Sequence, residues 1–178
     1  QLPDGRGRTT YQGCLAMDAG TGSSLVSGQG ERFVDEQASA NDIIAGMRQH
    51  DRSFLVMDDA SFNVYTETCI KSKNYTEGNL KEWVANNGSS DPVFATADSL
   101  EDLAAIVGMP GDALKASVDK YNGYLDAGED KDFGRNVSEK MGAGPYHFVE
   151  MHFRYYATLG GLRIKDQMQV MSTAEAPI

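Results

Sequence analysis

The segment SLEDLAAIVGMP, residues Ser99 to Pro110, carries the strongest fold signal in the sequence. Ser99 can accept hydrogen bonds from the first free backbone N–H groups of a helix, and Asp102, three residues later, can return a bond. Gly108 suits the left-handed residue that ends a helix, and Pro110 prevents the helix from continuing. The segment therefore predicts a helix with both ends defined and one apolar face, formed by Leu100, Leu103, Ala104 and Val107.

Further helices are expected on both sides of this segment. The helix that follows it presents three apolar residues on one face: Leu114, Val118 and Tyr121. Ser39–Arg48 carries apolar residues at helical spacing, and Asn79–Ala85 is also expected to be helical. The remainder of residues 60–82 is polar and mixed and shows no clear pattern.

Strand signals lie near both ends of the chain. Ser24–Ser27 and Arg32–Val34 are short extended runs joined through glycines, which predicts a hairpin. Phe54–Met57 is a compact apolar run that predicts a buried strand leading into a loop, and Leu162–Ile164 and Gln169–Met171 form a last alternating pair. Strands at both ends with helices between them predict an α+β domain, with a small mixed sheet and packed helices.

Composition narrows the classes of function. The 178 residues are 40% hydrophobic and 24% charged, as expected for a folded domain with a core. A net charge of −10 without a basic cluster argues against nucleic-acid binding, and no apolar run reaches the length of a membrane span. Two cysteines, Cys14 and Cys69, show no metal-ligand spacing. Two histidines, His147 and His152, are five residues apart, which does not suit a metal pair on one helix or one strand face.

Seven sequence blocks, taken in order, resemble the capping domain of the fumarate reductase flavoprotein family, which includes urocanate reductases. Each block alone is a weak match, but together they follow the family's order over nearly the whole chain. The blocks are Gly20–Val26, Gly30–Glu36, Phe54–Asp58, Ser99–Pro110, Val118–Asn122 with Asp130–Arg135, Gly144–Tyr146, and Thr158–Ile164.

The resemblance implies that residues 1–178 are a single substrate-capping domain, normally inserted in a Rossmann-like domain that binds FAD. Its implied partners are the protein's own FAD-binding domain and a small-molecule substrate. The one glycine-rich run, Asp18–Ser24, is not the Gly-x-Gly-x-x-Gly fingerprint that opens a helix onto a dinucleotide. We therefore expect FAD in the full-length protein and none bound to this chain alone. The resemblance points to a bacterial protein and leaves its compartment open, extracytoplasmic or not.

The residues of the family's proton path are replaced in this sequence. The position of the family's proton-donating arginine is Ala40, and the two positions that relay protons to it are Ala16 and Ala19. Alanine can neither donate nor shuttle a proton, so the resemblance implies a reductase of an activated alkene other than fumarate. The loss of cationic groups favours a less charged substrate.

The block around Thr158 is better kept and supplies the candidate site residues. Tyr156 stands where the family has a carboxylate-binding histidine, and its phenol can donate a hydrogen bond or a proton. Thr158 offers a hydroxyl, and Gly160 and Gly161 let the backbone approach a cofactor or substrate closely. Glu36 is a further candidate for a substrate-facing residue, although a loop or helix-capping role is the simpler interpretation.

Two alternatives remain open at this stage. The same family can run in the direction of a flavin-dependent dehydrogenase, for which a tyrosine acid or base is equally suitable. The chain can also be a non-catalytic module that reuses the fold to bind a small molecule. A flavin fingerprint on both sides of the chain in the genomic reading frame would favour the enzymes.

Overall fold

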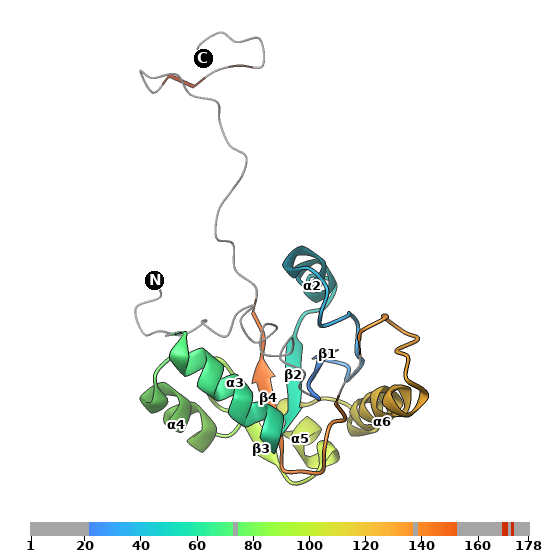
Figure 1. Cartoon of the computed structure of the whole chain (residues 1–178). Helices are drawn as coiled ribbons and strands as arrows, with labels where there is room; N and C mark the ends of the chain where they lie inside the picture. Colours follow the sequence, from blue (N-terminus) through green and yellow to red (C-terminus); the bar gives the residue numbers. More distant parts are fainter. Residues whose placement is uncertain (1–21, 73–74, 137–138, 153–168, 171, 173–178) are drawn as a thin grey trace.

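The computed structural model of the chain describes residues 22–72, 75–136, 139–152, 169, 170 and 172. These residues form a four-stranded sheet covered by helices on both faces (Figure 1). Along the chain the elements are β1 (Ser24–Ser27), α2 (Ala40–Met47), β2 (Ser53–Asp58), α3 (Asp59–Lys71), α4 (Glu77–Ala85), β3 (Phe94–Ala97), α5 (Leu100–Val107), α6 (Gly111–Ala127) and β4 (Tyr146–Glu150).

The strand order is β1-β2-β4-β3, and each described pair is antiparallel. The α+β class is thus confirmed, while the sheet is antiparallel in its described part where we expected a mixed one. β2 lies between two neighbours, and all six of its residues are buried. This burial on both faces explains why Phe54–Met57 is continuously apolar instead of alternating.

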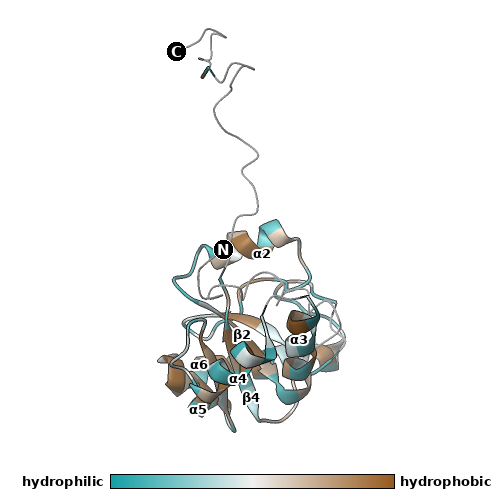
Figure 2. Cartoon of the chain, turned by 90° about the vertical axis from the view of Figure 1, so that its left-hand side faces the viewer, coloured by the Kyte–Doolittle hydropathy of each residue, from teal (hydrophilic) through white to brown (hydrophobic). Residues whose placement is uncertain are grey.

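The core has two halves, one on each face of the sheet. Strand residues that point to one face pack against α2, α3 and α4, and the alternate strand residues pack against α5 and α6. Leu55 and Val149 belong to the first half, whereas Phe54 and Phe148 belong to the second. Figure 2 shows both apolar and hydrophilic stretches along the helices, as expected for helices that pack one face on a sheet.

Helix α5 confirms the prediction from Ser99–Pro110 at both ends. The Ser99 hydroxyl accepts a hydrogen bond from the Asp102 backbone N–H at 3.1 Å, and Gly108 adopts φ 73°. One detail differs, because the Asp102 carboxylate accepts its 2.7 Å bond from the Ser99 hydroxyl and not from the backbone N–H of Ser99. The predicted helices at Ser39–Arg48 and Asn79–Ala85 correspond to α2 and α4, and the helix after Pro110 is α6.

Several elements were missed or wrongly predicted. The chain does not enter a loop after β2, because α3 begins at Asp59, with Asp58 accepting a hydrogen bond from the Ser61 N–H. Strands β3 and β4 were not predicted. The run Arg32–Val34 forms only a single bridge, between Val26 and Arg32, instead of the second strand of a hairpin. The expected strand at Leu162–Ile164, and Met171 at the end of the other, lie outside the described residues.

Candidate functional site

Four of the five candidate site residues, Tyr156, Thr158, Gly160 and Gly161, lie outside the described residues. The fifth, Glu36, is 1% exposed and lies at the centre of a buried ion cluster. We use this name for Arg32, Glu36, Asp130 and Arg135. Each of these four side chains is at most 5% exposed.

Glu36 is bound from three directions. Arg32 donates to both of its carboxylate oxygens, from Nε to Oε1 at 2.8 Å and from Nη2 to Oε2 at 2.6 Å. The backbone N–H of Leu25 donates to Oε1 at 2.9 Å, and Arg135 Nη1 lies 3.4 Å from Oε2. These contacts give Glu36 a structural role within the described part of the chain. Arg32 and Glu36 lie outside the described helices, so the helical i,i+4 rule does not account for their pairing.

Asp130 and two aromatic rings complete the cluster. Arg32 Nη1 lies 2.7 Å from Asp130 Oδ2, and the Arg32 guanidinium lies about 5 Å from the ring centres of Tyr121 and Phe133. Burial disfavours the charged form of Arg32, but hydrogen bonds and charges from Glu36 and Asp130 outweigh it and raise the pKa of Arg32 above its ordinary value. Arg32 is therefore a permanent cation.

Ala40, which the sequence resemblance aligns with the family's arginine, is the first residue of α2 and is half-buried. Ser39 caps this helix by accepting a hydrogen bond from the Asp42 N–H at 3.3 Å. The exposed residues that follow Ala40 are Asn41 and Asp42, so the described start of α2 carries an amide and a carboxylate and no cation.

The histidines occupy different surroundings. His147 is buried, with Nδ1 3.0 Å from Thr96 Oγ1 and Nε2 3.1 Å from Asp59 Oδ1. Burial lowers the pKa of His147 below its usual value of 6.5, although the Asp59 carboxylate acts in the opposite direction. His50 is half-buried, with its ring centroid 4.5 Å from that of Phe33. Among the described residues there is no group of three His, Cys, Asp or Glu that could hold a metal ion.

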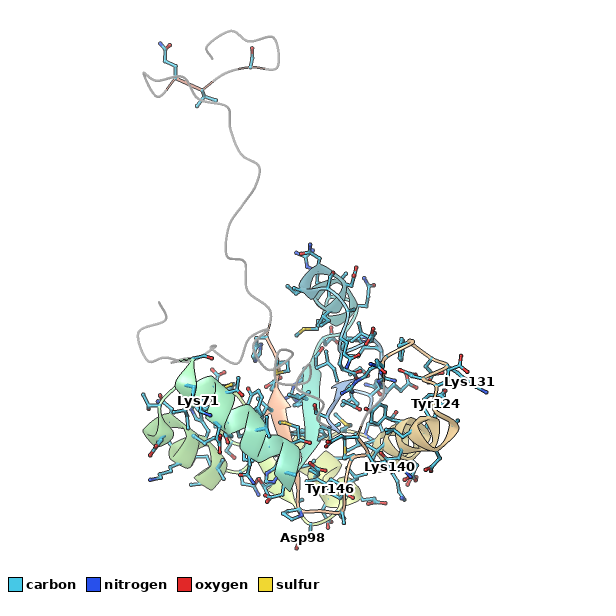
Figure 3. The ribbon with its side chains drawn as sticks, in the orientation of Figure 1. Lys71, Asp98, Tyr124, Lys131, Lys140 and Tyr146 are labelled. Atoms are coloured by element: carbon cyan, nitrogen blue, oxygen red, sulfur yellow. The ribbon has the colours of Figure 1, made fainter. Side chains whose placement is uncertain are left out.

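The described part of the chain includes two pockets of similar volume. One of about 330 Å³ lies against α6 and includes Arg32, Lys120, Tyr121 and Tyr124. Figure 3 shows Tyr124 and Lys131 at this outer edge of the domain. Another pocket, of about 350 Å³, lies between Gly28 and Gly108 near Arg52.

The described helix N-termini are poorly suited to the diphosphate of FAD. A dinucleotide site needs a helix N-terminus with free N–H groups. Four of the five described helices have their first N–H groups capped by their own side chains, those of Ser39, Asp58, Thr76 and Ser99. In addition, all five carry an Asp or Glu in the first turn, which would repel phosphate.

The geometry thus defines an α+β domain whose described strands are antiparallel, with a buried ion cluster that includes Glu36, four residues before the start of α2. Residues 6–178 match the family model described as FAD binding domain. This chain belongs to that FAD-binding family of flavoproteins.

Two reductases and one solved structure are similar to the chain. It is 30% identical over 165 residues to the vinyl phenol reductase of Lactiplantibacillus plantarum, covering 84% of this chain and 33% of that protein. It is 28% identical over 162 residues to a fumarate reductase (cytochrome) of Shewanella frigidimarina, covering 89% of this chain and 25% of that protein. A solution NMR structure of a fumarate reductase flavoprotein subunit from Lactobacillus plantarum matches with a TM-score of 0.72 and 22% identity, covering 88% of this chain and 98% of that one. The chain spans a quarter to a third of the length of these two reductases.

Proposed function

We propose that this chain is the substrate-capping part of an FAD-dependent reductase of an activated alkene. The observation that carries the proposal is the extent of the structural match. The fold accounts for 98% of a solved chain from a fumarate reductase flavoprotein subunit, but the chain spans only 33% and 25% of the two reductases. This pattern supports one part of a larger reductase, with the FAD bound by another part of the protein.

The substrate that we propose is an alkene activated by a neutral group, and not a dicarboxylate. The described start of α2 offers a hydroxyl, an amide and a carboxylate, so a substrate carboxylate would meet repulsion there instead of a cation. The relative with 30% identity is named a vinyl phenol reductase, and a vinyl phenol carries no carboxylate.

Within this proposal, Tyr156 is the proton donor or the orienting hydrogen-bond donor for the alkene. Thr158 adds a hydroxyl contact, and Gly160 and Gly161 allow the backbone to approach the reacting atoms. Glu36 supports the site from the ion cluster without contact to the substrate. Alone, the chain binds no FAD and has no activity.

The test uses the whole protein that contains this chain, purified and compared with the isolated 178 residues. The whole protein should carry flavin and, with a chemical electron donor, should reduce a vinyl phenol or an enone faster than fumarate or acrylate. The isolated chain should be colourless. A flavin-free whole protein would favour a non-catalytic binding module, and turnover only with a saturated substrate and an electron acceptor would favour a dehydrogenase.

A further inference from the structure

Residues of the segment from Arg32 to Glu36 pack against helix α2. Val34 is 8% exposed and belongs to the same half of the core as Ile43 and Met47 of α2. The Phe33 ring lies so close to Gly46 that a Cβ on this glycine would be 3.1 Å from Phe33 Cδ2. Arg32 and Glu36 therefore bracket the two side chains on which α2 rests.

Helix α2 has little other support within the described residues. It makes few contacts with the other helices and strands and stands out from the body of the domain (Figure 1). Its own packing consists mainly of Ile43 and Met47. The position of α2 consequently depends on where the segment before it is held.

The ion cluster holds that segment on both sides. Glu36 accepts from the Leu25 N–H of β1, and Arg135 Nη1 donates to the Ser23 carbonyl at 2.6 Å. On the other side Asp130 accepts from the backbone N–H groups of residues 132, 133 and 135, which fixes the loop that carries Arg135.

Contacts continue from the cluster to the first turn of α2. Gln37 Nε2 donates to the Asn136 carbonyl at 3.2 Å, and the Asn136 N–H donates back to Gln37 Oε1 at 3.1 Å. Two residues after Gln37, Ser39 caps α2. The Gln37–Asn136 pair, next to Glu36 and Arg135 in the sequence, thus lies two residues before the side chain that caps α2.

Net stabilisation is a weak explanation for four buried charges. Desolvation offsets most of the attraction in such sets, and apolar residues of similar size commonly stabilise a protein equally well. The best-attested use of buried polar or charged groups is to specify one packing register where apolar residues would allow several. The bidentate geometry between Arg32 and Glu36 is suited to this use, because both N–H···O bonds are kept at one relative position only.

We infer that the buried ion cluster is a positioning device that sets where α2 begins, and that Arg32 and Glu36 are positioning residues for the first turn of this helix. Any effect of the cluster on substrate binding rests on the proposed function, in which the start of α2 faces the alkene. The effect of the cluster on the order of α2 does not depend on the proposed function.

The test is hydrogen–deuterium exchange of the whole protein, read separately for α2 and for β2 and β4. The main variant replaces the cluster without leaving a buried charge: Arg32→Met, Glu36→Gln, Asp130→Asn and Arg135→Met together. We expect exchange in α2 to be at least about tenfold faster while exchange in β2 and β4 is little changed, because opening is then local. The matched control is Lys120→Met with Asp132→Asn, an exposed ion pair on the same side of the domain, which should leave α2 unchanged.

A second variant covers the case in which the fourfold change prevents folding. Arg32→Lys keeps the charge but cannot form the two-pronged bond to Glu36, so α2 exchange should still rise. Unchanged α2 exchange in either folded variant, or an equal rise in all elements, would overturn the inference. Because exchange needs no substrate, a protein without alkene reductase activity would refute the proposed function and leave this result standing.

Discussion

His147 Nε2 lies 3.1 Å from Asp59 Oδ1. This contact joins strand β4 to the first residue of α3. The other ring nitrogen contacts Thr96 of β3, and the ring stacks on Phe62 with centroids 4.0 Å apart and planes 4° apart. His147 thus links β4, β3 and α3 inside the domain. From the sequence we had inferred only that His147 and His152 do not suit a metal pair.

This arrangement predicts a pH dependence of stability. Because the pKa of His147 is lowered in the folded state, the unfolded chain binds a proton near pH 6.5 before the folded one does. The free energy of unfolding should be fully developed above about pH 7.5 and should decrease as the pH falls through 6.5 toward the folded-state pKa. Thermal melts from pH 8 to pH 5 measure this.

The matched comparison replaces each of the two histidines in turn. His147→Gln should be less stable at pH 8 and should show a flatter decline toward pH 5 than the unmodified protein. His152→Gln, at an exposed position, should keep the original slope. Parallel curves for all three proteins would contradict the assignment of the slope to His147.

The cap of α5 should contribute measurably to stability. Ser99→Ala removes the acceptor for the Asp102 N–H and should cost about 0.5–2 kcal/mol in the free energy of unfolding. Ser99→Asn, which keeps a good capping side chain, should recover most of the loss. Denaturant unfolding of the three proteins provides the measurement, and equal midpoints would show that the cap is not needed.

Two glycines should respond to alanine with opposite signs. At Gly22 a Cβ would overlap the Lys140 carbonyl group, so Gly22→Ala must displace backbone and should cost about 1–3 kcal/mol. At Gly123, inside α6, no atom outside the helix backbone lies within 4 Å of where an added Cβ would be. Gly123→Ala should therefore stabilise the helix by about 0.5–1 kcal/mol. Thermal melts of the two variants measure both changes in stability. A stabilised Gly22→Ala variant would mean that the backbone around Gly22 and Lys140 packs differently.

Under the proposed function, the whole protein should reduce fumarate poorly. Ala16, Ala19 and Ala40 offer no proton path of the family's kind, and a neutral Tyr156 weakens binding of a carboxylate. A steady-state assay with saturating fumarate should give little turnover under conditions where a neutral alkene is reduced. Efficient fumarate turnover would show that the alignment of these positions to the family is wrong.

Tyr156 provides the sharpest test of the proposed chemistry. Tyr156→Phe keeps the ring and removes the donor, so kcat should fall by about 10²- to 10⁴-fold if the phenol is the general acid, with little change in the melting temperature. If the phenol only binds substrate, KM should rise with kcat nearly unchanged. A change in the melting temperature alone would indicate a packing role.

The adjacent phenol is the control for this experiment. Tyr155→Phe removes a hydroxyl of the same kind one position earlier and should leave both kinetic constants near those of the unmodified protein. Equal losses from the two substitutions would remove Tyr156 from the proposed active site.

The sequence was sufficient to predict elements whose determining residues are close together in the chain. The cap at Ser99, the left-handed Gly108 and the stop at Pro110 define α5 from adjacent residues alone, and the structure has the helix where they predict it. The α+β class and the central strand β2 were likewise visible, because burial on both faces requires a run of apolar residues. The resemblance to flavoprotein reductases also came from the order of short blocks, and the family match over residues 6–178 agrees with it.

Elements that depend on distant partners were not visible in the sequence. Helix α3 buries Phe62, Tyr65 and Cys69 at helical spacing, but Ser61 and Thr66 are buried beside them, which weakens the apolar pattern in the sequence. Strands β3 and β4 are short, and each is held by the other and, for β4, by β2 as well. Their pairing energy comes from residues some fifty or more positions away, which a local pattern cannot register.

The sequence alone therefore determined the capped helices, the apolar central strand and the family, since each follows from neighbouring residues or from their order. Only the tertiary structure decided the role of Glu36. Its partners Arg32, Leu25 and Arg135 are 4, 11 and 99 residues away, and the fold brings them to one carboxylate. A carboxylate that is desolvated must be paired, and only the fold supplies the partners that pair Glu36.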